Sequence, residues 1–216
     1  MKLTIEFIER NFNEFNEKFF SGKLKKPVFE INRTKSFFGL CCWKNKTTKK
    51  GKLVCRFDYR IKISEYFDRS ETDYINTILH EMIHLYIRQF DLAPESEHHG
   101  RVFKSIAENI NKHGYDVRYM QSGEGVGLTD KNVVFFLTAF RDRSGRYFLI
   151  RYNPKRFDYF KYNFELSGFT KVIWFTSTND KKYGHLPMCR KRAGGMLISE
   201  DDYNELKEIE EYRETA

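Results

Sequence analysis

Residues 80–84 read HEMIH, with two histidines four positions apart and a glutamate directly after the first. On an α-helix, residues four apart lie on one face, so His80 and His84 can direct two imidazoles at one metal ion. Glu81 falls beside that face, where its carboxylate can reach a water molecule held by the metal. Two nitrogen ligands, a base and an open position for water are what zinc-dependent peptide hydrolysis needs. The spacing predicts one catalytic zinc per chain, with Glu81 as the general base.

A catalytic zinc site needs a third protein ligand. The downstream candidates are Glu95, Glu97, His98, His99 and Glu108. The pattern H-E-x-x-H-x-x-G-x-x-H is excluded, because Ile87 and Phe90 stand where its glycine and third histidine belong. The pair His98–His99 is favoured, since Gly100 lets the chain fold closely where a loop enters the next helix. Spacing alone does not choose between the two histidines.

Helical and extended patterns predict the elements that position this motif. Apolar residues recur at helical spacing in 4–20, 71–90 and 100–113, with Thr4 as the N-cap of the first helix. Short apolar runs predict strands at 27–32, 37–43 and 52–58, and residues 60–64 could extend the last of them. The lysine-rich segment between the last two strands predicts a hairpin tip.

The pattern changes after residue 120. The glycine-rich stretch QSGEGVGLTD at 121–130 predicts a linker. Strands are predicted at Val133–Phe140, Tyr147–Tyr152 and Val172–Thr176, and a capped acidic helix at 200–213. The predicted fold is α+β, with a small mixed sheet packed on the helices that carry the motif in 1–120. A small, basic, β-rich C-terminal domain follows in 131–216.

Composition and charge narrow the class of protein. The 216 residues carry a net charge of +8 and 17% aromatic residues, ample for a core. Residues 131–198 hold 14 basic against 4 acidic side chains, which attracts polyanions such as nucleic acid. No apolar run suits a membrane span or a secretory signal, so a cytoplasmic protein with no membrane partner is expected. The four cysteines form no C-x-x-C pair and are expected to be small apolar fillers.

Residues 151–164 (RYNPKRFDYFKYNF) alternate basic and aromatic side chains. This mixture suits single-stranded DNA, whose bases stack on rings and whose phosphates meet lysine and arginine. The predicted contacts are Arg151, Lys155, Arg156 and Lys161. The alternative is a strand pair with an aromatic inner face and a charged outer face.

The first half of the chain resembles the SprT-like family of zinc metalloproteases, which includes the Spartan proteases of DNA–protein crosslink repair. The resemblance rests on HEMIH, on a fifteen-residue step to the H-G-x-x-F pattern at His99, Gly100 and Phe103, and on FNEFNEKFFSGKL at 12–24. It covers residues 1–115. It implies that His99 is the third zinc ligand beside His80 and His84, with Glu81 as the base. Many relatives carry a Cys-x-x-Cys zinc ribbon next, but here only Cys189 remains, so any such ribbon would be metal-free.

The expected function is therefore a zinc metalloendopeptidase that acts on DNA-associated or DNA-crosslinked proteins. Its expected partners are protein substrates and DNA, single-stranded or bound without sequence preference. The alternative is a non-catalytic, zinc-containing module that binds nucleic acid. The position of Glu81 argues against the alternative, since a structural zinc site needs no base beside its ligands.

Overall fold

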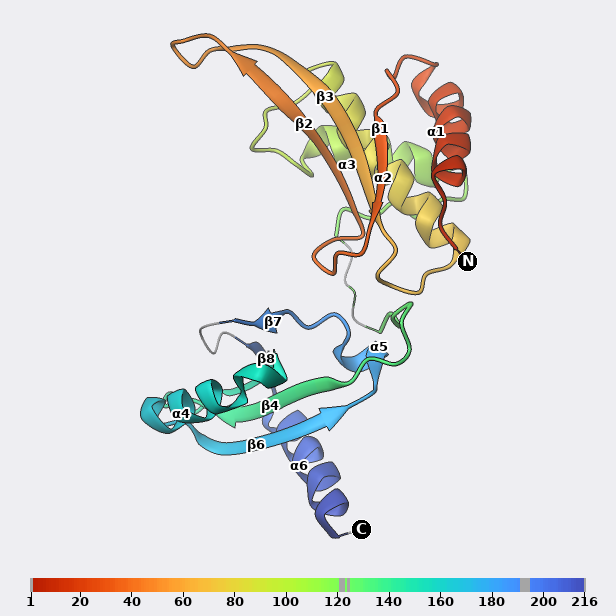
Figure 1. The fold of residues 1–216 in the computed structure, drawn as a ribbon. Coiled ribbons are helices and arrows are strands. Elements are labelled where there is room, and N and C mark those ends of the chain that lie inside the picture. The colour runs from red at the N-terminus through yellow and green to blue at the C-terminus, as the bar shows by residue number, and fades with distance from the viewer. Residues whose placement is uncertain (1, 121–122, 124, 191–194, 216) are drawn as a thin grey trace. The chain divides into compact units, whose positions relative to one another are not determined.

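The structure is a computed structural model that describes residues 2–120, 123, 125–190 and 195–215. The chain divides into two units, Met1–Ser122 and Gly123–Ala216, each with its own sheet and helices. The predicted α+β class is confirmed, as is the β-rich C-terminal part (Figure 1). Across the described ranges, no helix combines the length and apolar character that crossing a membrane requires.

The first unit contains a three-stranded mixed sheet. Its strands are β1 (Val28–Asn32), β2 (Gly39–Thr47) and β3 (Leu53–Ser64), in the order β1-β3-β2. β3 is central, parallel to β1 and antiparallel to β2, so β2 forms one edge. The three predicted strands are present; β2 is longer than expected, and β3 includes the continuation through 60–64. Their hairpin extends beyond the helices (Figure 1).

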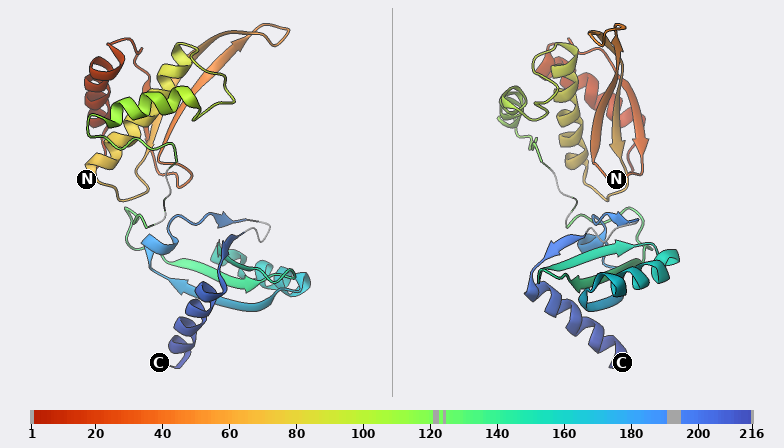
Figure 2. Two further views of the ribbon diagram at one scale, coloured as in Figure 1. Left: turned by 180° about the vertical axis from the view of Figure 1, so that it is seen from behind. Right: turned by 90° about the vertical axis from the view of Figure 1, so that its left-hand side faces the viewer.

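Three helices pack with this sheet: α1 (Ile5–Phe20), α2 (Glu71–Gln89) and α3 (Arg101–Asn111). The Thr4 side chain accepts a hydrogen bond from the Phe7 backbone, as predicted for the N-cap of α1. A capping box between Ser70 and Asp73 begins α2. Seen along the sheet, the helices lie on one face, and α3 lies on the side of α2 away from the strands (Figure 2).

The core of this unit lies between the sheet and α2. Ile61 and Ile63 of β3 are fully buried against the apolar face of α2, which includes Ile78 and Met82. The opposite face of the sheet is polar and carries an ion-pair cluster of Glu30, Arg60 and Lys62. The sheet is therefore packed on one side only, and α2 is enclosed between the strands and α3.

The second unit is built on strands β4 (Phe135–Arg141), β5 (Tyr147–Tyr152), β6 (Thr170–Ser177), β7 (Met188–Cys189) and β8 (Met196–Ile198). The order is β6-β4-β5-β7, and β8 also pairs with β5. Helix α4 (Phe157–Ser167) covers one face, and α6 (Glu200–Thr215) contacts the other, where the rings of Tyr147 and Tyr203 lie 4.9 Å apart. The short helix α5 (Asp180–Tyr183) precedes β7.

The strand-pair alternative for residues 151–164 is wrong, because only its start is extended. A 3-10 turn, η1 (Pro154–Arg156), leads into helix α4 (Phe157–Ser167). Phe157, Phe160 and Phe164 follow helical spacing and pack on the aromatic face of the sheet. The alternation of aromatic and basic residues concealed this period.

Part of the predicted linker packs with the second unit. Residues 121, 122 and 124 lie outside the described ranges. Leu128 is buried, and its backbone N–H donates to the carboxylate of Asp180 over 2.7 Å. The later part of the stretch 121–130 is thus an ordered piece of the second unit.

Candidate metal centre

Helix α2 brings His80 and His84 together on one of its faces. The helix runs without interruption through Glu71–Gln89, so the four-residue spacing places the two rings 4.9 Å apart. Their Nε2 atoms lie 3.1 Å from one another. This confirms the geometry that the HEMIH pattern predicts.

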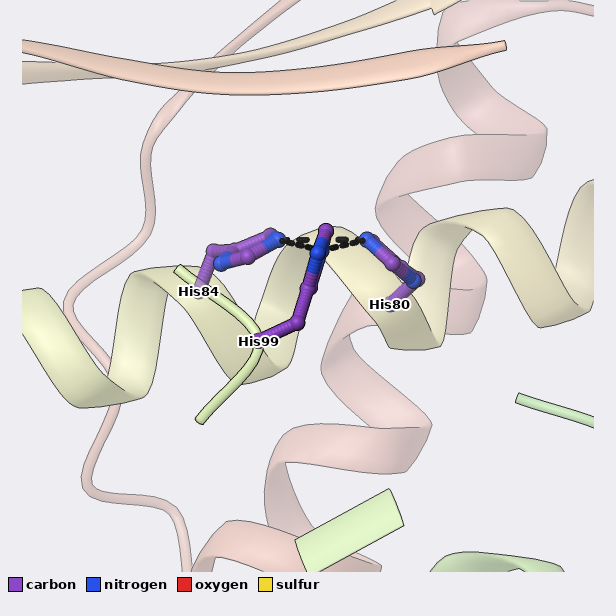
Figure 3. Close-up of side chains that lie close together, drawn as sticks. All are labelled: His80, His84 and His99. Atoms are coloured by element: carbon purple, nitrogen blue, oxygen red, sulfur yellow. Dashed lines mark hydrogen bonds between the residues drawn. The ribbon is translucent and has the colours of Figure 1, made fainter. Parts of the chain in front are cut away.

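His99 joins this pair from the loop that precedes α3. Its Nε2 atom lies 3.1 Å from Nε2 of His80 and 3.1 Å from Nε2 of His84 (Figure 3). Gly100 stands at the N-cap of α3 with extended backbone, which turns the loop into the helix directly after His99. Three imidazole nitrogens therefore converge on one point from two separate elements.

Arg88 holds the loop that carries His99. This side chain is buried one turn beyond His84, and its guanidinium donates hydrogen bonds to the carbonyls of Ala93 and Pro94, over 2.7 and 3.1 Å. The guanidinium also lies 5.6 Å from the centre of the Trp43 ring. The loop is thus fixed to the same helix that carries the other two histidines.

The three nitrogens fit a tetrahedral zinc ion. Zinc–nitrogen bonds of about 2.0–2.1 Å separate tetrahedral ligand atoms by about 3.3 Å, close to the observed 3.1 Å. His80 Nδ1 lies 2.8 Å from the carbonyl oxygen of Arg118, which can only accept. The hydrogen must therefore be on Nδ1, which leaves the Nε2 lone pair free for a metal. The Phe103 ring packs against all three imidazoles, at 4.8 to 4.9 Å between centroids.

The protonation state of the histidines also suits a metal. Burial lowers the pKa of His80 to about 4 and that of His84 to about 3. Burial lowers the pKa of His99 as well. All three imidazoles are therefore neutral at pH 7, the form that coordinates a metal ion.

Glu81 points toward the sheet. Its side chain is only 4% exposed and accepts a hydrogen bond from the backbone N–H of Cys41 in β2. Burial raises the pKa of Glu81 to about 8, and the Cys41 N–H opposes that rise. A cation bound at the histidines would lower this pKa, because positive charge favours the carboxylate.

The remaining candidates for a third ligand lie elsewhere. His98 and Glu108 are exposed, and Glu95 forms an ion pair with Arg56. Within the described part of the chain, His80, His84 and His99 are the group of side chains whose ligand atoms lie close enough for one ion. The structure thus brings His99, and not His98, together with His80 and His84.

The predicted nucleic-acid residues are all in the second unit, but they differ in exposure. Lys155, Arg156 and Lys161 are exposed, whereas Arg151 is 7% exposed with its guanidinium over the Phe135 ring. Arg156 also donates to the carbonyl of Arg190. Arg151 is therefore part of the core, and the other three side chains remain available at the surface.

Sequence reasoning missed three features of the centre: the Arg88 side chain, the Arg118 carbonyl and the close approach of Gly39 to Glu81. The role of Arg88 could have been suspected from the sequence, because this arginine follows His84 by four residues on an apolar helix and so lies on the same face. The role of Gly39 could have been suspected as well, since a glycine in a strand often marks a place where another part of the protein approaches the backbone closely. A backbone carbonyl such as that of Arg118 leaves no trace in a residue pattern.

The fold and the histidines together define an α+β domain whose H-E-x-x-H helix and following loop bring together three histidines that could hold a metal ion. A family model, the SprT-like family, matches residues 8–122, just over half of the sequence. The chain belongs to the SprT-like family, as its motifs predicted, and this membership points to a zinc-metalloprotease-type domain. No curated protein sequence matches the chain.

Replacing His99 with alanine should lower zinc affinity by more than about 10-fold, because one of three nitrogen ligands is lost. His98→Ala is the matched control and should retain one zinc per chain, since His98 is exposed. Elemental analysis combined with chelator competition measures both variants. Loss of zinc in His98→Ala, with retention in His99→Ala, would move the ligand by one residue.

Arg88→Met should also weaken zinc binding, by about 10- to 100-fold, because the loop before His99 loses its anchor. Methionine fills most of the buried volume but cannot donate to the two carbonyls. Arg33→Met, at an exposed arginine after β1, serves as the control. Equal zinc affinity in both variants, measured by chelator competition, would show that the loop needs no such anchor.

Proposed function

We propose that the first unit is a zinc-dependent endopeptidase, with His80, His84 and His99 as the zinc ligands and Glu81 as the general base. The observation that carries the proposal is the convergence of three neutral imidazole nitrogens beside a buried carboxylate. Membership of the SprT-like family supports the same assignment.

When bound, zinc lowers the pKa of a coordinated water toward about 7 and polarises a carbonyl group. Glu81 accepts a proton from the water that attacks the peptide carbonyl carbon, and then delivers it to the leaving nitrogen as the C–N bond breaks. Its surroundings suit both steps: the Cys41 N–H stabilises the carboxylate, and burial stabilises the protonated form.

The alternative is a module in which zinc is purely structural. A structural site is normally closed by four protein ligands, whereas three histidines leave one position open. Burying the Glu81 carboxylate costs free energy whatever its role, and a structural zinc site has no need of it. Both features favour catalysis over a structural role.

Glu81→Gln should keep its zinc and lose about 10²- to 10⁴-fold in kcat, because the amide cannot accept the proton. Cleavage of a DNA-binding protein, followed with and without single-stranded DNA, provides the activity. Chelator-treated wild type is the control and should be inactive. If Glu81→Gln loses its zinc as well, Glu81 is a structural residue and its assigned role is wrong.

We further propose that the substrates are DNA-associated proteins and that the second unit contacts DNA. Lys155 and Lys161 are exposed near the exposed rings of Tyr159 and Tyr162, at 44% and 62% exposure. Basic side chains can neutralise phosphates while aromatic rings stack on bases. The excess of basic over acidic side chains in residues 131–198 also favours DNA binding.

An aromatic pocket in the same unit adds to this proposal. It lies where η1 meets the sheet and is lined by Phe136, Tyr152, Pro154, Phe157, Trp174, Phe175 and Thr176. The rings of Phe157 and Tyr152 both meet Trp174 edge-on, at 5.1 and 5.3 Å. A pocket with such walls accepts a flat apolar group, and Lys155 lies next to Pro154 in the sequence.

DNA binding should weaken steeply between about 50 and 200 mM salt and show little sequence preference. The double variant Lys155→Gln/Lys161→Gln should reduce the slope of log affinity against log salt by about 1.4, since each phosphate contact with a single strand contributes roughly 0.7. Fluorescence anisotropy with a labelled single strand measures both quantities.

Lys23→Gln/Lys112→Gln, which removes two exposed charges from the first unit, is the control for net charge. An unchanged slope in the Lys155/Lys161 variant would exclude these contacts. Equal binding by wild type at both salt concentrations would contradict the DNA proposal as a whole.

A further inference from the structure

Strand β2 contacts the candidate base at a position where the sequence has a glycine. Gly39 begins β2, and Cys41, two residues on, donates its backbone N–H to the Glu81 carboxylate. Because side chains alternate along a strand, positions 39 and 41 face α2, whereas Leu40 faces away and is 39% exposed. Position 39 is therefore directed at the helix that carries Glu81.

The space beside Gly39 is filled by α2. A Cβ atom at this position would lie 2.6 Å from Oε1 of Glu81, 2.8 Å from Cγ of Glu81 and 2.7 Å from Cγ2 of Thr77. These distances are all shorter than ordinary van der Waals contact. Thr77 precedes Glu81 by one helical turn, so both contacts lie on the same face of α2.

The backbone does not explain the glycine. Gly39 is absent from the residues with positive φ, so any amino acid could adopt its conformation. What excludes a side chain is the neighbouring face of α2, namely the Glu81 side chain and the methyl group of Thr77. Glu81 and Thr77 are 4% and 1% exposed, which leaves the carboxylate little room to move aside.

We infer that Gly39 is a positioning residue for Glu81: its missing side chain forms the seat in which the carboxylate meets the Cys41 N–H. The inference rests on the proposed function, because the role of Glu81 as the general base is what gives this seat a catalytic purpose. Helix α2 and the loop before α3 place the three histidines, while β2 places the base. Metal binding and turnover should therefore be separable at position 39.

Gly39→Ala should retain one zinc per chain with affinity within about 3-fold of wild type, because the three histidines are carried by α2 and the loop before α3 and not by β2. Its kcat should fall by about 10-fold or more while KM stays within about 3-fold, since the loss concerns a proton transfer rather than substrate binding. Leu40→Ala, one residue along and on the other face, is the matched control and should behave like wild type. Unchanged kcat in Gly39→Ala overturns the inference.

A double-mutant cycle on thermal unfolding of the metal-free, full-length protein tests the contact without any activity. Gly39→Ala should lower Tm by about 4 °C or more, as overpacking of a filled site does. In a Glu81→Ala background the vacated space should accept the new methyl group, and the shift should fall below half of that value. Equal shifts in both backgrounds overturn the inference.

The two measurements separate failure of the inference from failure of the proposed function. If wild type cleaves nothing but the cycle shows coupling, Gly39 seats Glu81 and the peptidase proposal is wrong. If Gly39→Ala folds only together with Glu81→Ala, the coupling is large and the inference stands. If Gly39→Ala fails to fold both alone and together with Glu81→Ala, then the strand itself or Thr77 excludes the methyl group, and the inference is overturned.

Discussion

The convergence of three neutral imidazoles, with Nε2 atoms 3.1 Å apart, depends on packing rather than on attraction. Lone pairs directed at a common point repel one another, so the arrangement exists only because its supports are rigid. Helix α2 provides that rigidity, since the sheet contacts one side of it and α3 the other. Arg88 then fastens the loop of His99 to the same helix. One enclosed helix thus sets the position of every group in the centre.

The enclosure of α2 also gives different surroundings to the histidines and to Glu81, although all belong to one short sequence motif. His80 and Glu81 are neighbours, yet successive residues of a helix point about 100° apart. His80 faces the loop and the Phe103 ring, while Glu81 faces the backbone of β2. The three histidines therefore have an aromatic environment, and Glu81 has an apolar one with a single backbone donor.

The sequence predicted the centre where the responsible residues are close in the chain. HEMIH fixed the helix and two of the histidines, because a four-residue spacing has one geometric meaning on a helix. His99 needed the family resemblance, since a fifteen-residue loop can be folded in many ways. Arg88 and Gly39 were missed because residue spacing does not predict the contacts on which their roles depend. Arg88 contacts the carbonyls of Ala93 and Pro94, and Gly39 lies against the side chain of Glu81. In the second unit, α4 was missed because phenylalanines at helical spacing were interleaved with tyrosines and lysines.

Cys41 and Cys55 lie on paired strands but in opposite surroundings. Cys41 is buried beside Glu81, and burial together with that charge holds the pKa of its thiol well above the ordinary range. Cys55 lies exposed on β3 in the extended hairpin. Alkylating reagents and peroxides react with accessible thiolates, so they reach the hairpin and spare the thiol next to the base. The native Cys55 is therefore a ready attachment point for a fluorophore or spin label.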